Sequence, residues 1–314
     1  RMVCQCTLNF FGYSALAFVA YRILLAFYNV LFPYFIGTPV DLHKKAGAKW
    51  AVVTGATDGI GKAYATQLAK KKFNVLLISR TQSKLDDTKT EIEQAAPGVD
   101  VATFAFDFSA TTHDAYEPLI QTLKKYEIGV LVNNVGMSFE YPEVLHATEG
   151  GLQRLADMTT INCLPTVLLS AVALEQMSTR KAGIVINISS GAAYNEMSHW
   201  NVYSSAKRFV MHLSAILRAE YGAKGITVQC IAPMLVATKM AKIRRASFFG
   251  PFADKFVAAA LRTVGLVDDT TGFFSHQIQV EVMNLLPRFI RNKIIHSNTM
   301  AMRAGALKKR AKGE

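Results

Sequence analysis

The sequence predicts an α/β fold with a doubly wound parallel sheet, an N-terminal membrane segment and a C-terminal amphipathic helical extension. Three observations support this. Short apolar runs alternate with helical patterns, a glycine-rich turn joins the first run to the first helix, and the two ends are apolar and basic. The 314 residues suffice for one large domain with appendages, which we expect at 1–40, 48–275 and 276–314.

The N-terminal segment is apolar enough to enter a membrane. From Leu8 to Ile36 its only charged residue is Arg22, and about 20 apolar residues cross a bilayer core of about 30 Å. Because an arginine in mid-bilayer is costly, one tilted span and a hairpin that returns to the same side are both open. The run is too long for a cleaved signal peptide. Three lysines at 44–49 follow it, whereas only Arg1 precedes it, which predicts that the rest of the chain faces the cytosol.

The first predicted strand leads into a phosphate-binding turn. Trp50–Thr54 is a short apolar run, and a helical pattern begins just after the glycines that follow it. Glycines let the backbone approach a phosphate, and a helix N-terminus offers free N–H groups to it. This Rossmann-like arrangement predicts a dinucleotide site whose turn contains Gly55, Thr57, Asp58, Gly59, Ile60 and Gly61.

The second predicted strand, Asn74–Ser79, ends where an acidic residue would contact the ribose of NAD. Here Ser79 is followed by Arg80. A guanidinium suits a ribose phosphate because it presents paired donors. The pair therefore predicts NADPH/NADP+ as cofactor, and the alternative is that Arg80 only caps the loop.

A tyrosine and a lysine on one helical face form the candidate reaction centre. Tyr203 and Lys207 are four residues apart, and a Ser-Ser-Gly turn containing Ser190 lies thirteen residues before Tyr203. A nearby ammonium favours the ionised phenol and would lower a Tyr203 pKa that is about 10 unperturbed. Such a phenol can exchange a proton with a carbonyl or an alcohol.

Taken together, these motifs resemble the short-chain dehydrogenase/reductase family over roughly residues 48 to 240. The matching segments are Thr54-Gly-x-x-x-Gly-x-Gly61, Asn133-Asn134-Val135-Gly136, and the set Asn162, Ser190, Tyr203 and Lys207. The resemblance implies further cofactor contacts at Asp107, Asn134, Gly136, Tyr203, Lys207, Pro233 and Thr238. Met234 departs from the family, which has glycine after the proline.

The resemblance also implies a role for each member of the set. Tyr203 would donate a proton to the substrate oxygen, Ser190 would hold that oxygen, and Lys207 would grip the nicotinamide ribose. Asn162 would hold a water molecule that resupplies the proton. Pro165 lies inside the same predicted helix, 151–177, and a kink there would free carbonyls for that water.

Within the family, the amino-acid sequences of three segments resemble those of the membrane-bound group of the 17β-hydroxysteroid dehydrogenase type 12, or very-long-chain 3-oxoacyl-CoA reductase. These segments are 50–62, 133–142 and 236–244. The resemblance implies the endoplasmic reticulum membrane and reduction of a 3-oxoacyl-CoA in fatty-acid elongation, with elongation-complex partners and a homodimer as further expectations. A steroid or another lipid ketone is the alternative substrate. A non-catalytic membrane scaffold is the alternative of another class.

The C-terminal region predicts contact with lipids rather than nucleic acid. Apolar residues at 278, 282, 285, 286 and 289 recur at helical spacing. Residues 288–314 contain eight Lys or Arg and only one acidic residue. A basic amphipathic helix suits anionic lipid heads, and no nucleic-acid module accompanies the charge. In this family a cluster of phenylalanines, 248–256, would lie over the substrate, and a short packed helix pair is the alternative interpretation of this segment. The four cysteines show no metal-ligand spacing, so no metal is expected, although Cys4 and Cys6 could be acylated.

Overall fold

A computed structural model describes residues 5–241, 243 and 245–312. The expectations for Cys4, and the last two residues of the basic tail, lie outside the described residues. The centre is a seven-stranded sheet in the order β3-β2-β1-β4-β5-β6-β7, and every neighbouring pair is parallel. The predicted doubly wound parallel sheet is thus confirmed. Its strands are β1 Trp50–Thr54, β2 Asn74–Ser79, β3 Val101–Ala105, β4 Ile128–Asn133, β5 Gly183–Ile188, β6 Ile226–Ile231 and β7 Asp269–Thr270.

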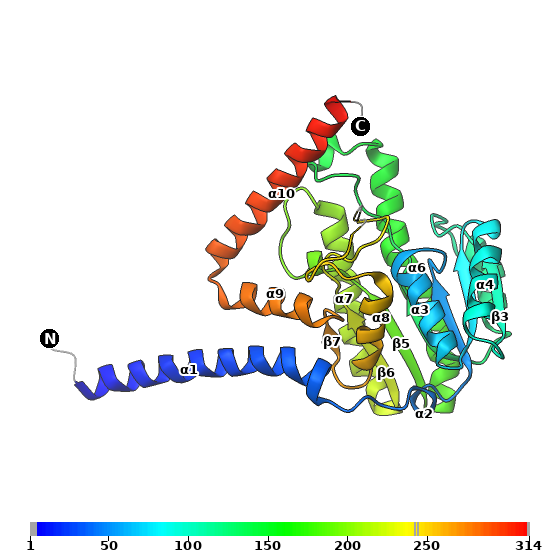
Figure 1. The fold of residues 1–314 in the computed structure, drawn as a ribbon, viewed down its shortest axis with the longest axis horizontal. Helices are drawn as coiled ribbons and strands as arrows, with labels where there is room; N and C mark the ends of the chain where they lie inside the picture. Colours follow the sequence, from blue (N-terminus) through cyan, green and yellow to red (C-terminus); the bar gives the residue numbers. More distant parts are fainter. Residues whose placement is uncertain (1–4, 242, 244, 313–314) are drawn as a thin grey trace.

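Helices cover both faces of the sheet, because successive strand residues point to opposite sides. Ala51 and Val53 of β1 join an apolar cluster with α3, α4 and α8, whereas Val52 joins a second cluster with α5 and α6 (Figure 1). The covering helices are α2 Leu42–Ala46, α3 Gly59–Lys70, α4 Gln82–Ala95, α5 His113–Leu123, α6 Gly151–Arg180, α7 Asn201–Tyr221 and α8 Ala253–Arg262. Short 3-10 helices are η2 Leu145–Ala147, η3 Gly191–Ala193 and η4 Gly222–Lys224.

The N-terminal segment forms one continuous helix rather than a hairpin. It consists of α1, Gln5–Leu31, and the π-helical turn η1, Phe32–Ile36. Figure 1 shows α1 projecting from the rest of the molecule. Among the residues that the structure describes, two helices, Cys6–Ile36 and Gly151–Arg180, are long and apolar enough to cross a membrane. The second is α6, which packs on the sheet.

Arg22 has a specific partner outside α1. Its Nη2 donates a hydrogen bond to the carbonyl oxygen of Asn284 at 3.0 Å, and Asn29 Nδ2 donates to Glu281 Oε1 at 3.0 Å. Both acceptors belong to α9, Phe274–Leu285. The second half of α1 is therefore fixed along α9, and the guanidinium of Arg22 lies at this helix contact.

The C-terminal extension is helical, but the apolar spacing at 278–289 does not belong to one helix, because two helices occupy that region. α9 ends at Leu285 and α10 runs from Arg288 to Ala311. Leu286 has extended backbone with ψ 142°, as expected for a residue that precedes a proline, and Pro287 cannot continue the hydrogen bonding of α9. After the break, α10 runs from the end of α9 to the loop between β4 and α6, where Arg303 donates hydrogen bonds to Glu143 (Figure 1).

Candidate functional site

The glycine-rich turn connects the end of β1 to the start of α3, beside the point where the strand order reverses between β1 and β4. Gly55 and Gly59 have positive φ angles of 62° and 53°. A β-carbon on Gly61 would lie 2.2 Å from the carbonyl oxygen of Gly55. The turn is therefore a close backbone cradle at a helix N-terminus, which is suited to a phosphate.

Asp58 caps the helix that begins in this turn. Its Oδ1 accepts a hydrogen bond from Gly59 N at 2.8 Å, and its Oδ2 is 3.4 Å from Lys239 Nζ. Ile60 is partly buried against the apolar cluster beneath α3. These two residues shape the turn, and the lysine offsets the negative charge of the cap.

The region expected to hold the adenosine end lies at the ends of β2 and β3. Thr57 Oγ1 and Ser79 Oγ are hydrogen-bonded at 3.0 Å, and Arg80 is exposed beside them. Asp107 is also exposed and accepts a hydrogen bond from Ser109 N at 3.0 Å. The structure thus places these predicted residues along one edge, where the Arg80 guanidinium could hold a ribose phosphate.

Asn134 ties β4 to β1. Its backbone N donates to Thr54 Oγ1 at 3.0 Å, and its Nδ2 donates to the Thr54 carbonyl oxygen at 2.9 Å. The side-chain Nδ2 of Asn134 also lies 2.4 Å from the position that a β-carbon on Gly61 would take. The side chain therefore holds the end of β4 against the glycine turn.

Tyr203 and Lys207 share a face of α7, as predicted. The Lys207 Nζ lies 5.9 Å from the centroid of the Tyr203 ring. Lys207 is only 4% exposed, and its Nζ donates a hydrogen bond to the Ile188 carbonyl oxygen at 3.1 Å. Burial disfavours the charged form and lowers the pKa of the Lys207 ammonium to about 8.

The predicted lowering of the Tyr203 pKa is wrong for this arrangement. Burial raises the pKa of the phenol above its ordinary value, and a hydrogen bond with Ser190 acts in the opposite direction. The Lys207 ammonium donates its hydrogen bond to the Ile188 carbonyl oxygen and not to the phenol. The phenol therefore stays protonated at neutral pH, which is the form that a proton donor needs.

The structure also separates the two serines that follow β5. Ser189 is buried and its Oγ donates to the Lys207 carbonyl oxygen at 2.7 Å. Ser190 has extended backbone with φ −161°, and its Oγ accepts a hydrogen bond from Ala192 N at 3.2 Å and interacts with Tyr203. Ser190 is thus the serine that stands beside the phenol.

Asn162 links α6 to the loop that follows β4. Its Nδ2 donates to the carbonyl oxygens of Met137 and Met158, both at 2.8 Å, and its Oδ1 accepts from Met137 N at 3.3 Å. A β-carbon on Gly136 would lie 2.9 Å from Asn162 Oδ1 and 3.1 Å from Lys207 Nζ. Gly136 therefore lies between the two side chains, while α6 continues through Pro165 to Arg180.

His276 is a residue of this site that sequence reasoning missed. It is completely buried, and its Nδ1 accepts a hydrogen bond from Met234 N at 3.3 Å. Burial lowers the pKa of His276 to about 4, so the ring is neutral and can accept. No local pattern marked a histidine on α9 as a partner of the segment after β6.

The segment after β6 also contacts both predicted turns. The Pro233 carbonyl oxygen accepts a hydrogen bond from Gly191 N at 2.7 Å. The methyl group of Thr238 lies 3.2 Å from where a Gly59 β-carbon would be, and Thr238 Oγ1 accepts from Ala241 N at 3.3 Å. Pro233 and Thr238 thus lie at the two ends of one segment that passes from the serine turn to the glycine turn.

Comparisons with known proteins agree with this geometry. Residues 49–247 match the model of the short chain dehydrogenase family. The very-long-chain 3-oxoacyl-CoA reductase let-767 of Caenorhabditis briggsae is 57% identical over 309 residues, which are 98% of each chain. Putative steroid dehydrogenase 1 of Caenorhabditis elegans is 46% identical over 95% of each chain. The short-chain dehydrogenase from Sphingobium yanoikuyae in complex with NADPH superposes with a TM-score of 0.60 at 26% identity, over 68% of this chain and 82% of that chain.

Proposed function

The chain belongs to the short-chain dehydrogenase family, and we propose that it uses NADPH to reduce the ketone of a long-chain 3-oxoacyl-CoA to the 3-hydroxyacyl-CoA. The observation that carries the proposal is the 57% identity, over 98% of both chains, to a relative named very-long-chain 3-oxoacyl-CoA reductase. The placement of Ser190 and Lys207 around the protonated Tyr203 supports the same reaction.

The chain's own residues perform the proton chemistry. Tyr203 donates its phenolic proton to the ketone oxygen, and Ser190 holds that oxygen by a hydrogen bond. Lys207 binds the ribose next to the nicotinamide and supplies positive charge beside the developing phenolate. Asn162 fixes the loop between β4 and α6 on which Gly136 lies. We also propose that Asn162 holds the water molecule that resupplies the proton.

The cofactor supplies the hydride when it is bound. The glycine turn fits the diphosphate of the cofactor, because Gly55, Gly59 and Gly61 carry no side chain that would keep a phosphate away from the backbone N–H groups at the N-terminus of α3. We assign the ribose phosphate to Ser79 and Arg80. The remaining contacts that we propose are Thr57, Asp58, Ile60, Asp107, Asn134, Gly136, Pro233 and Thr238.

The direct test measures NADPH oxidation by the detergent-purified protein with a long-chain 3-oxoacyl-CoA, estrone and retinal. We expect the acyl-CoA to be reduced fastest, and a Tyr203→Phe variant to bind NADPH but lose activity at least 100-fold, because the proton donor is gone. A Tyr203→Phe protein that reduces the acyl-CoA at the parent rate would refute the assigned donor.

A steroid ketone is the second candidate substrate, because one relative at 46% identity is named a putative steroid dehydrogenase. Faster reduction of estrone than of the acyl-CoA would establish it. The scaffold alternative predicts instead that the protein is inert toward every ketone in the same assay, although it folds and binds NADPH.

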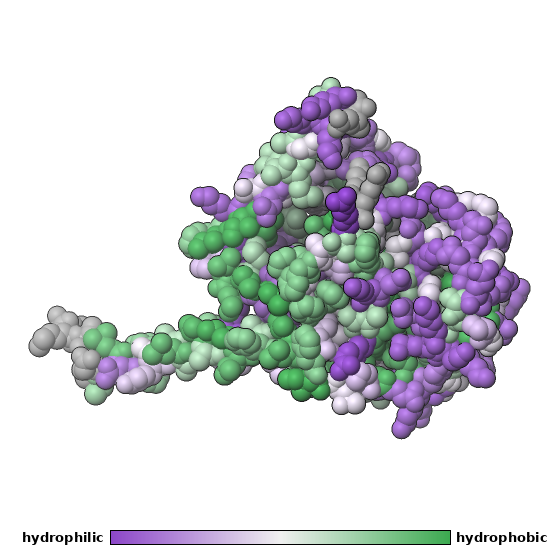
Figure 2. Space-filling view, viewed as in Figure 1, coloured by the Kyte–Doolittle hydropathy of each residue, from purple (hydrophilic) through white to green (hydrophobic). Residues whose placement is uncertain are grey.

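We further propose that the chain is anchored in the endoplasmic reticulum membrane through residues 1–40, with the reductase domain, 48–275, facing the cytosol. Apolar side chains of α1 are exposed along its length, and Figure 2 shows this apolar surface continuing onto the neighbouring part of the domain. A row of ring contacts extends it, from Phe35 to Phe274 at 5.7 Å, to Phe248 at 5.5 Å and to Phe249 at 4.8 Å. Release from microsomes by alkaline carbonate, or protection of the domain from added protease, would contradict this placement.

The C-terminal extension, 276–314, and the oligomeric state complete the proposal. We propose that exposed apolar residues of α9 and α10, such as Leu285 and Phe289, meet lipid at the membrane surface. We also propose a homodimer through α6 and α7, which expose Val167, Phe209 and Ile216. Light scattering in detergent tests the dimer, and co-purification from microsomes tests the elongation-complex partners.

A further inference from the structure

We propose that Glu143 and Arg303 are positioning residues for the reaction. Together they fasten α10 to the loop after β4 and to the segment that leads into the Tyr203 helix. This inference rests on the proposed reductase activity and assigns to it two residues outside the reaction centre. It also gives α10 a role other than lipid binding.

Glu143 makes contacts on three sides. Its carboxylate accepts two hydrogen bonds from Arg303, at 3.1 Å from Nε to Oε1 and at 2.6 Å from Nη2 to Oε2. Its backbone N donates to the His199 carbonyl oxygen at 2.9 Å, and its carbonyl oxygen accepts from Asn201 Nδ2 at 3.1 Å. One residue therefore connects α10 to the two positions on either side of Trp200.

The connection continues to the phenol by ring contacts. The ring centroid of Trp200 lies 6.4 Å from that of Tyr203 and 6.3 Å from that of Phe139. Asn201 is the first residue of α7, two positions before Tyr203. A shift of Glu143 would thus move the start of the helix that carries the proton donor.

The Glu143–Arg303 pair differs from the other ion pairs of α10. The Glu143 side chain is 8% exposed and that of Arg303 is 29% exposed, whereas Arg288 and Glu196 form a pair that is 70% and 75% exposed. Buried bidentate pairs lose most when one partner is removed, whereas exposed pairs contribute little. The hydrogen bonds from Arg303 also hold the pKa of the Glu143 carboxyl below its usual range, so it is charged at neutral pH.

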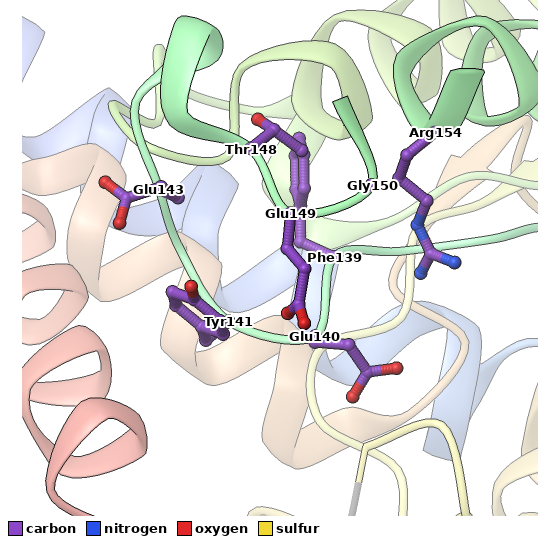
Figure 3. A pocket seen from close by; sticks show the side chains of 8 residues that line it. All are labelled: Phe139, Glu140, Tyr141, Glu143, Thr148, Glu149, Gly150 and Arg154. Carbon is purple, nitrogen blue, oxygen red and sulfur yellow. The ribbon is translucent and has the colours of Figure 1, made fainter. Parts of the chain in front are cut away.

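A second attachment of α10 reaches the same loop. Arg310 pairs with Glu149, donates to Tyr141 Oη at 3.2 Å, and lies over the Tyr141 ring at 5.2 Å. Figure 3 shows Glu143, Tyr141 and Glu149 along this one loop, where all three line a pocket of about 260 Å³. Two arginines of α10 are thus held by acids of one loop, which we expect to keep the helix in place during turnover.

The test compares Glu143→Gln and Arg303→Lys with the matched control Arg288→Gln, which breaks the exposed pair on the same helix. We expect kcat to fall about 10- to 100-fold in the first two, because small displacements of reacting groups have effects of this size. The NADPH dissociation constant, measured by fluorescence titration, should stay within about twofold in all three because the cofactor residues are untouched, and Arg288→Gln should keep the parent kcat.

A charge exchange separates positioning from general damage. The single variants Glu143→Arg and Arg303→Glu should each lose kcat. The double variant Glu143→Arg with Arg303→Glu should regain part of that loss, because opposite charges face each other again. Glu143→Gln and Arg303→Lys proteins that melt with the parent and keep its kcat would overturn the inference. A fall in kcat matched by an equal loss of NADPH binding would also overturn it. An inert parent protein would instead refute the proposed function.

Discussion

Replacing Gly136 with alanine tests how tightly the reaction centre is packed. The added β-carbon would lie 2.9 Å from Asn162 Oδ1 and 3.1 Å from Lys207 Nζ. Neither neighbour has room to retreat, because Asn162 is 1% and Lys207 is 4% exposed. The ammonium must therefore move by some tenths of an ångström and weaken its 3.1 Å bond to the Ile188 carbonyl.

We expect Gly136→Ala to lower kcat about 10- to 100-fold and to destabilise the fold by about 1 to 3 kcal/mol, as overpacking does. Steady-state kinetics with the acyl-CoA and thermal unfolding measure the two effects. Gly222→Ala is the matched control, since a β-carbon there meets nothing within 4 Å and φ is −59°. A Gly136→Ala protein with the parent kcat would show that Lys207 does not need its present position.

Two further predictions follow from charge. Arg80→Asp should raise the KM for NADPH by at least about tenfold while changing that for NADH little, because the paired donors to the ribose phosphate are lost; an equal loss for both cofactors would remove Arg80 from the phosphate. The pKa of Lys207 of about 8 lies below its unfolded value of about 10.4, so the unfolded state holds more protons between these pH values and this group's contribution to stability rises with pH there. Because the folded protein loses the charged form of Lys207 around pH of about 8, kcat/KM should fall above that pH. A profile that stays flat to pH of about 10 would contradict this.

The sheet could be predicted because its signals are local. The bounds expected for β1 and β2 match the structure. Buried parallel strands read as short apolar runs, and the glycine turn fixes where the first of them ends. The shared face of Tyr203 and Lys207 follows in the same way from helical spacing.

Long-range contacts could not be predicted from such signals. Glu143 and Arg303 are 160 residues apart, and nothing near either residue marks its partner. The contact of His276 with Met234 likewise arises only when α9 folds against the segment after β6. The break between α9 and α10 is different, because Pro287 is a local signal that ends a helix, although the apolar spacing continues across it.

The error in the Tyr203 pKa has the same origin and alters the view of the reaction. Spacing places a cation near the phenol, but it does not show how much water the fold removes from both groups. Burial raises the pKa of Tyr203 and lowers that of Lys207 to about 8, so each shift favours the neutral form of its group. A reductase must keep the phenolic proton until the ketone oxygen accepts charge, and a raised pKa of the donor meets that need. The partly titrated ammonium of Lys207 then matters most at the moment when Tyr203 becomes a phenolate, because its attraction acts on the charged product and not on the neutral donor.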